Sequence, residues 1–283
     1  MTAVQCPTSS FDIRTTAGFY STVAGVSAGF AFAALFYFIT SQTSPRFIGE
    51  KAESDARVTD LRDLAAQALG AAFGTLLLSS ITYAVLAGEP KSAGRAATIE
   101  VVAGIGFAVG AIQLFYAIVL MIRAHQEIGS NLERYFRNLG GLFLCPLASL
   151  MIDLGVSDWE ETKHHDRAAE ITYHVGLAIS LVVAIICIIV AVWRRRDHNR
   201  TFSRFCNPAY WAIAVGGATI VGTSSLSVVV GECTAASPGV MYFLVIVTAV
   251  VLVNQALWFY WPPEIFQSLT CTAKQAARGQ TGE

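Results

Sequence analysis

Charged residues are scarce in this chain. Asp, Glu, Lys and Arg make up 14% of its 283 residues, whereas hydrophobic residues make up 54%; an ordinary soluble domain has roughly a quarter of its residues charged. So few charges cannot cover the surface of a water-soluble fold. The net charge of −1 also argues against nucleic acid as a partner, because phosphate binding needs a basic surface.

The sequence also lacks common enzyme and cofactor motifs. It contains no phosphate-binding loop, no dinucleotide fingerprint, no His-Glu-x-x-His and no Cys-x-x-Cys. These absences argue against an enzyme without excluding one, and they predict no organic cofactor. A retinal Schiff base in the last helix is excluded, because no lysine falls in a predicted span: the four are Lys51, Lys91, Lys163 and Lys274.

What the chain does have is a series of apolar runs of about twenty residues, the length of a helix that crosses a bilayer. We predict an all-α, polytopic membrane helix bundle with about seven transmembrane helices in one domain, and a short cytoplasmic tail at 262–283. The first run is expected to be a retained helix rather than a cleaved signal. The predicted spans are about 18–42, 64–88, 98–122, 139–156, 168–193, 208–230 and 239–261.

The fourth run allows two interpretations, a span or a re-entrant segment, because it is short and contains Pro146 and Asp153. Lys and Arg collect in cytoplasmic loops. With seven spans, fourteen of the nineteen Lys and Arg residues fall on one side; without the fourth crossing the split is ten against nine. The charge asymmetry favours seven spans, with the N-terminus outside and the C-terminus in the cytoplasm.

This topology sorts the cysteines. Cys145 and Cys187 lie inside predicted spans, whereas Cys6 and Cys233 both fall on the outer side. Disulfides persist in such an oxidising compartment. We predict a bond between Cys6 and Cys233, the alternative being two free thiols too far apart to meet.

Small residues predict how the helices pack. Gly70 with Gly74 and Gly106 with Gly110 are spaced four apart, which lets helix backbones approach closely in lipid. Such faces also predict contacts in a homo-oligomer. Besides the bilayer itself, anionic lipid is an expected partner of the basic run after the fifth span, formed by Arg194, Arg195 and Arg196.

Polar residues at span depth are candidate functional residues, because such groups are costly in lipid. Asp153 is the acid furthest inside any run, and Gln113, Asn254 and Gln255 are amides at depth. The sixth span has five hydroxyl residues within nine positions, Ser225 among them. Hydroxyls can bond to their own helix and need no partner. The sharper interpretation is a polar transport path, formed by Asp153, Gln113, Ser225 and Asn254.

Glu170 and His174 are four residues apart on one face of the fifth span. A carboxylate and an imidazole in reach of each other can bind a divalent metal such as zinc, or pass protons. The alternative is a pair solvated by headgroups and water. Tryptophans near span ends, such as Trp159, are expected at the membrane interface.

We therefore predict a multi-pass integral membrane protein that acts as a small-solute or ion transporter or channel. The alternative is a non-enzymatic sensor or assembly subunit that binds a partner through basic cytoplasmic loops, and a metal-dependent hydrolase using Asp153, Glu170 and His174 is a third. Arginine outnumbers lysine by fifteen to four and alanine is abundant. This composition favours a bacterial plasma membrane over an organelle.

Overall fold

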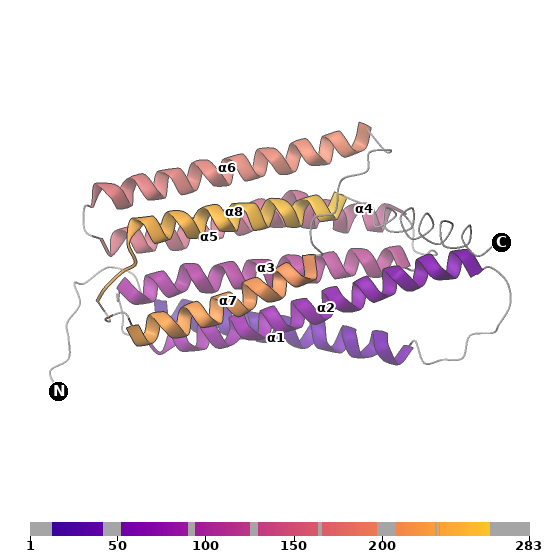
Figure 1. Ribbon diagram of the computed structural model, residues 1–283, viewed down its shortest axis with the longest axis horizontal. Coiled ribbons are helices and arrows are strands. Elements are labelled where there is room, and N and C mark those ends of the chain that lie inside the picture. The colour runs from indigo at the N-terminus through magenta and orange to yellow at the C-terminus, as the bar shows by residue number, and fades with distance from the viewer. Residues whose placement is uncertain are drawn as a thin grey trace, which may run out of the picture.

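The computed structural model describes residues 13–41, 52–89, 94–124, 130–163, 166–196, 208–229, 231 and 233–260. Within these residues the regular structure is helical throughout, and the helices follow the long axis of an elongated bundle (Figure 1). In chain order the elements are α1 (Ile13–Ser41), α2 (Ala52–Ala87), α3 (Gly94–Ala124), α4 (Ser130–Asn138), the π-helical turn η1 (Leu139–Leu144), α5 (Cys145–Glu161), α6 (Arg167–Arg196), α7 (Pro208–Val229) and α8 (Pro238–Tyr260).

Several helices begin at residues that suit a first turn. α7 and α8 start at Pro208 and Pro238, where a missing backbone N–H costs little because the first turn offers it no acceptor. α6 follows Asp166, whose side chain accepts a hydrogen bond from the N–H of Ala168 at 3.0 Å. These signals lie in the local sequence, so the three helices start within one residue of the predicted positions.

Seven helical segments of the described chain are long and apolar enough to cross a membrane. This confirms the predicted all-α architecture with about seven potential spans. Most helices are longer than their predicted apolar cores; α2, for example, begins at Ala52 rather than near 64. A helix continues through polar residues beyond the apolar run, because its backbone hydrogen bonds do not depend on side-chain hydropathy.

The fourth segment is one continuous helix. α4, η1 and α5 follow one another without interruption, and a span-length segment runs from Asn131 to Glu161, so the predicted range of 139–156 was too short. In η1 the N–H of Cys145 bonds the carbonyl oxygen of Gly140, five residues back. Pro146 lies in the first turn of α5. The wider π turn therefore accommodates a residue that has no N–H to donate.

The bundle has two ends, which we name by their first and last described residues. α1 begins at one end, the Ile13 end, and α8 finishes at the opposite one, the Tyr260 end (Figure 1). α1, α3, α6 and α8 run in one direction, and α2, α5 and α7 run in the other. Because the fourth segment runs the length of the bundle, the chain passes along the bundle an odd number of times, and its first and last described residues lie at opposite ends.

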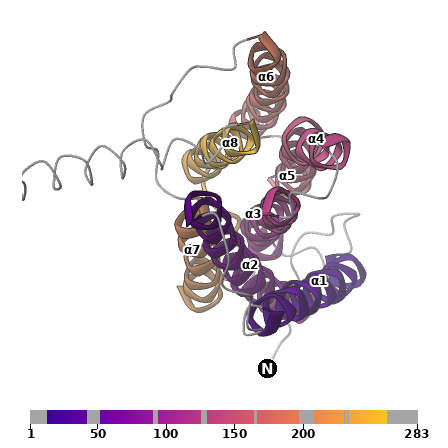
Figure 2. The ribbon, with the colours of Figure 1, turned by 90° about the vertical axis from the view of Figure 1, so that its right-hand side faces the viewer.

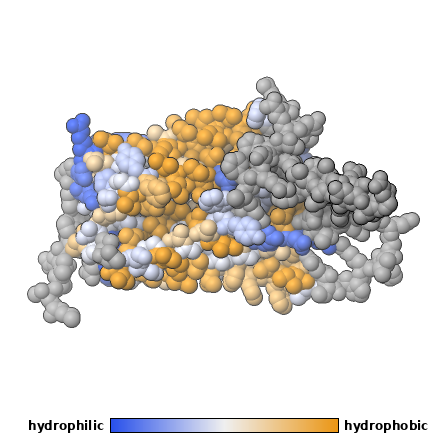
Figure 3. Space-filling model, in the orientation of Figure 1, coloured by the Kyte–Doolittle hydropathy of each residue, from blue (hydrophilic) through white to orange (hydrophobic). Residues whose placement is uncertain are grey.

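α3 lies at the centre of the bundle. In its most apolar window 67% of the residues are buried, against 22% in α1, α6 and α7. An end-on view places α3 among α1, α2, α5 and α8 (Figure 2). The peripheral helices expose large apolar side chains, including Phe30, Tyr37 and Leu181, and hydrophobic residues cover much of the visible surface (Figure 3). Such a surface suits lipid rather than water.

Glycines allow the closest contacts around α3. A Cβ added to Gly106 would lie 2.8 Å from Ser79 Oγ and 3.0 Å from Thr219 Oγ1, so α2 and α7 both approach the α3 backbone here. At Gly110 the added Cβ would lie 2.9 Å from Leu76 Cγ. The expectation of close packing at Gly106 and Gly110 is confirmed.

The same expectation is wrong for the other glycine pair. A Cβ on Gly70 or Gly74 would meet nothing within 4 Å. The four-residue spacing is identical in the two helices, but α2 turns this face away from its neighbours whereas α3 is surrounded. Spacing alone does not say whether a glycine face is occupied.

We predict that Gly140→Ala destabilises the protein. Gly140 packs against the ring of Phe259, which is fully buried, and an added Cβ would overlap ring atoms that have no space to retreat. Overpacking of this kind costs about 1–3 kcal/mol. The melting temperature of the purified protein in detergent measures the loss. Gly74→Ala is the matched control; an equal fall for both variants would contradict the packing described here.

Candidate functional site

Most buried hydroxyl groups are satisfied within their own helix. Ser79, Thr172 and Thr248 each donate to the carbonyl oxygen four residues back, at 2.8, 2.7 and 2.7 Å. On α7, Thr219 donates to Gly216 at 2.8 Å. Thr219 is therefore satisfied by its own helix and needs no polar path. Buried carboxyl and amide groups cannot be satisfied so easily, and they mark the candidate site.

Asp153 is a buried carboxyl on α5 that faces α6. Its side chain lies over Gly176, where an added Cβ would be 2.9 Å from the Asp153 Oδ1 atom. Ser180, one turn further along α6, lies near the carboxyl and shares a 2.5 Å contact with Ser149 of α5. Asp153 is 4% exposed, and its Oδ2 has no hydrogen-bond partner among the described residues.

Gln113 on α3 and Gln255 on α8 are completely buried amides. Each side chain is 0% exposed, and neither the oxygen nor the nitrogen of either amide has a hydrogen-bond partner within the described part of the chain. An unpaired amide in an apolar environment costs about 1–3 kcal/mol on protein mutational scales. Two such amides therefore carry a substantial cost in folding free energy if their role is packing alone.

The two glutamines lie in the same layer of the bundle. One turn before them, Val109 and Val251 belong to one buried cluster. About one turn after them, the rings of Tyr116 and Phe259 pack at 5.7 Å between centroids. Because α3 and α8 run in the same direction, these contacts bracket both amides at one depth.

A second acidic group lies nearer the Ile13 end. Glu100 of α3 interacts electrostatically with Asp158 of α5 and with Tyr83 of α2. Glu100 Oε2 is buried without a hydrogen-bond partner in the described residues. One turn along α3, a Cβ on Gly104 would lie 3.8 Å from the Tyr83 hydroxyl, an ordinary van der Waals distance. The sequence placed Glu100 at this end but offered no sign that Tyr83 joins it.

The four residues predicted to form one polar path do not share a common interior. Asp153 faces α6, whereas Gln113 lies in the layer shared with α8. Asn254 is half-buried, and its neighbour Gln255 is the fully buried amide of α8. Ser225 is exposed on the outer side of α7. Helical periodicity explains why Gln255 rather than Asn254 is the buried amide, because residues 248, 252, 255 and 259 share the buried face of α8.

The proposed metal pair lies on the surface. Glu170 and His174 are both exposed on α6. No group of three or more His, Cys, Asp or Glu side chains that could hold a metal ion occurs among the described residues. The helical spacing does put the two side chains on one face, but that face points away from the other acids. Asp153 is buried, so these three residues form no joint centre.

The described cysteines differ in their bonding state. Cys145 and Cys187 are buried free thiols within α5 and α6. Cys233 is disulfide-bonded. Its predicted partner Cys6 lies outside the described residues, so the pairing of Cys6 with Cys233 stays a prediction.

The segment that holds Cys233 is anchored to the bundle. The N–H of Ala236 donates to Thr98 Oγ1 of α3 at 3.0 Å, and its carbonyl oxygen accepts from the indole of Trp159 at 3.2 Å. Trp159 is fully buried, which corrects its predicted place at the membrane interface. Its indole N–H needs a partner, and the segment before α8 supplies one.

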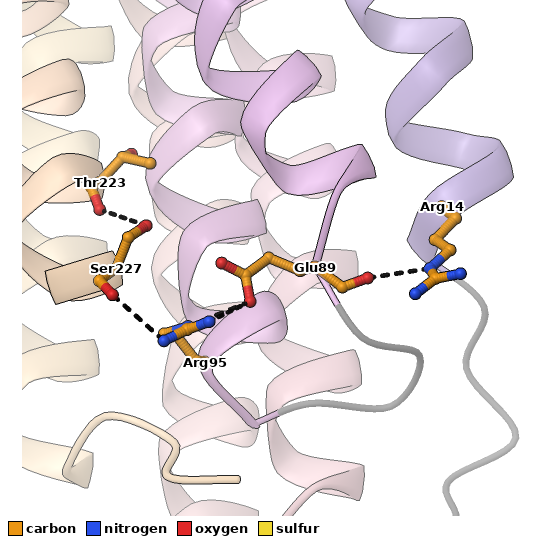
Figure 4. Close-up of polar contacts among 5 residues, drawn as sticks. All are labelled: Arg14, Glu89, Arg95, Thr223 and Ser227. Atoms are coloured by element: carbon orange, nitrogen blue, oxygen red, sulfur yellow. Dashed lines mark hydrogen bonds and ion pairs between the residues drawn. The ribbon is translucent and has the colours of Figure 1, made fainter. Parts of the chain in front are cut away.

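A charged clamp ties four helices together at the Ile13 end (Figure 4). Arg95 at the start of α3 donates to Glu89 Oε2 through Nη2 at 2.6 Å and through Nε at 3.1 Å. Its Nη1 donates to the carbonyl oxygen of Ser227 in the last turn of α7, at 3.2 Å. Arg14 of α1 donates to the backbone oxygen of Glu89, after α2, at 2.9 Å. The two arginines thus bond carbonyl oxygens at or just beyond helix ends, which lack helical partners.

Comparison of this chain with protein-family models, with curated proteins and with solved structures finds no match. The function must therefore be inferred from the chemistry of the buried groups. Those groups are one carboxyl between α5 and α6, one buried amide on α3 and one on α8, and an acidic pair with a tyrosine at the Ile13 end.

We predict that Glu89→Gln destabilises the bundle by about 3 kcal/mol, because it leaves the Arg95 guanidinium largely buried without its counter-charge. The melting temperature should fall clearly. The double variant with Arg95→Gln should recover part of the loss, since the uncompensated charge is then gone. Additive losses in the double variant would mean that the pair is not coupled.

Proposed function

We propose that this multi-pass membrane protein is a transporter or channel for a small polar solute or ion. The observation that carries the proposal is the presence of buried, unpartnered polar atoms on Asp153, Gln113 and Gln255. Ionisable and polar groups in transmembrane helices are expensive, and they are retained mostly where they meet a substrate, an ion or a proton. A bundle that served only as a scaffold would gain stability from apolar residues at these positions.

The amide layer and Asp153 have different roles in this proposal. Gln113 and Gln255 offer unpartnered donors and acceptors at a similar depth of the bundle, which suits a polar solute without demanding a particular charge. Asp153 offers a carboxyl that can take up or release a proton or bind a cation. Gly176 leaves the space beside it, and Ser180 supplies a hydroxyl.

We infer that the Tyr260 end is cytoplasmic and that the membrane is a bacterial plasma membrane. Of the Lys and Arg residues in the described part of the chain, four lie toward the Ile13 end, Arg14, Arg95, Lys163 and Arg167, and eight lie toward the Tyr260 end, Arg57, Arg62, Arg123, Arg134, Arg137, Arg194, Arg195 and Arg196. The excess of basic residues in the loops of the Tyr260 end follows the positive-inside rule. The Ile13 end, with the disulfide-bonded Cys233, then faces the oxidising exterior.

A second candidate function is an assembly or sensor subunit. Ser224 and Ser225 are exposed on α7, and the neighbouring α2 presents Gly70 and Gly74 with nothing within 4 Å of an added Cβ. Small and hydroxyl residues on an outer face suit contact with a further transmembrane helix. The two candidates differ in one respect: a subunit of this kind needs its partner, whereas a transporter moves its substrate when it is alone in a membrane.

We expect the purified protein in liposomes to support flux of protons or monovalent cations, read by a trapped pH dye and by ion-selective dyes. Asp153→Asn should reduce that flux at least about tenfold, because it removes the ionisable group and keeps its size. The melting temperature should stay close to the parent value. Ser225→Ala, on the exposed face of α7, is the control and should leave flux unchanged.

Two results would contradict this expectation. Unaltered flux in the Asp153→Asn variant would remove Asp153 from the mechanism. Absence of flux in the parent protein for protons, sodium and potassium, together with a stoichiometric membrane partner in native mass spectrometry, would favour the assembly subunit.

The orientation can be tested by labelling with a membrane-impermeant maleimide. Asp166→Cys, exposed at the Ile13 end, should be labelled in intact cells, and Asn131→Cys, exposed at the Tyr260 end, should be labelled after permeabilisation alone. The parent chain reports labelling of the native cysteines. The reverse pattern, or labelling of both positions in intact cells, would overturn the assignment.

A further inference from the structure

The Tyr260 end contains a cluster of two arginines and one glutamate. Arg123 comes from the last turn of α3, and Glu133 and Arg137 come from α4. Arg123 Nε donates to Glu133 Oε1 at 2.8 Å, and Arg137 Nη1 reaches the same oxygen at 3.4 Å. The side chains of the three residues are 12%, 25% and 25% exposed, so the cluster is largely screened from water.

The charges in this cluster do not balance. One carboxylate is shared by two guanidinium groups, which leaves a net charge of +1. At the opposite end, one oxygen of Glu89 accepts two hydrogen bonds from the guanidinium group of Arg95, at 2.6 and 3.1 Å. A largely buried surplus charge is unfavourable unless an anion compensates it.

Two donors of the cluster are left unpaired. Arg123 Nη1 and Arg137 Nε are buried, and neither has a hydrogen-bond partner among the residues that the structure describes. Guanidinium groups form short, charge-assisted hydrogen bonds with phosphate oxygens, often in pairs. The two unpaired donors come from adjacent elements, so one anion with several oxygen atoms can accept from both.

The surroundings place the cluster where the helices leave the apolar layer. Arg123 ends the apolar run of α3. On the other side of α4, Leu132 and Tyr135 are 44% and 61% exposed. Apolar and aromatic side chains exposed beside arginines are typical of the headgroup region of a bilayer. The Arg137 guanidinium also lies 6.0 Å from the centre of the Tyr260 ring, which helps to hold it in place.

We propose that Arg123 and Arg137 form a binding site for a phosphate-bearing anion at the Tyr260 end of the bundle. The shared chemistry is a phosphate group that accepts from both guanidinium groups; its source is either the headgroup of an anionic phospholipid or free phosphate. Glu133 holds the two arginines together and competes with the anion for their charge. The site is separate from the buried amides and from Asp153, so it does not depend on the proposed transport.

The test measures the melting temperature of the full-length protein in detergent during titration with three probes: inorganic phosphate, phosphatidylglycerol in mixed micelles, and phosphatidylcholine as the zwitterionic control. We expect phosphate or phosphatidylglycerol to raise the melting temperature and phosphatidylcholine to have little effect. A response to phosphatidylglycerol alone identifies a lipid site, and a response to phosphate identifies a site for the free anion.

Substitutions distinguish a built site from general surface charge. Arg137→Gln should weaken the apparent affinity about tenfold, through loss of a charged hydrogen bond. Arg134→Gln removes the same charge from an exposed position of the same helix and should have little effect. Glu133→Gln should strengthen binding, because it removes the competing carboxylate; a purely structural ion pair predicts destabilisation without tighter binding.

Arg123→Gln removes the other arginine of the site. If that variant fails to fold, Arg137→Gln decides whether the site binds the anion. The proposal is overturned if neither phosphate nor phosphatidylglycerol raises the melting temperature of the parent protein. It is equally overturned if Arg134→Gln and Arg137→Gln weaken the response to the same extent, or if Glu133→Gln leaves the affinity unchanged or lower.

Discussion

A polar group without a hydrogen-bond partner is costly where no water can reach it, and this cost shapes the bundle. It makes each span a helix, because a helix satisfies its own backbone. It makes buried hydroxyls such as Ser79 and Thr248 donate to their own helix. Where neither solution is open, as for Asp153 and Gln113, polar atoms remain unpaired, and these exceptions locate the candidate function.

The two ends of the bundle meet the same constraint in different ways. At the Ile13 end, Arg95 bonds the Glu89 carboxylate and a carbonyl oxygen in the last turn of α7, so the protein itself supplies partners for this guanidinium group. At the Tyr260 end, Arg123 and Arg137 share Glu133 and keep unpaired donors. One end is therefore a structural clamp, and the other has capacity left for an anion.

α3 connects these features. Its glycines let α2 and α7 approach, and Gln113 lies in the layer shared with α8. Its first turns carry Arg95 and Glu100, and its last turn carries Arg123. A change in the position of α3 would therefore reach Gln113 and the charged groups at both ends of the bundle, whereas Asp153 belongs to the contact between α5 and α6.

The sequence by itself determined the class of protein and the starts of α6, α7 and α8, because apolar run length, prolines and capping residues act locally. It also picked out Asp153 and Gln113 as buried, since both lie deep within apolar runs. The tertiary structure alone decided which faces are covered. That is why Gly106 is packed and Gly74 is not, and why Gln255 is buried while Ser225 is exposed. It is also why Trp159 lies buried inside the bundle. Equal spacing in two helices has different consequences, because burial depends on which neighbour each face meets.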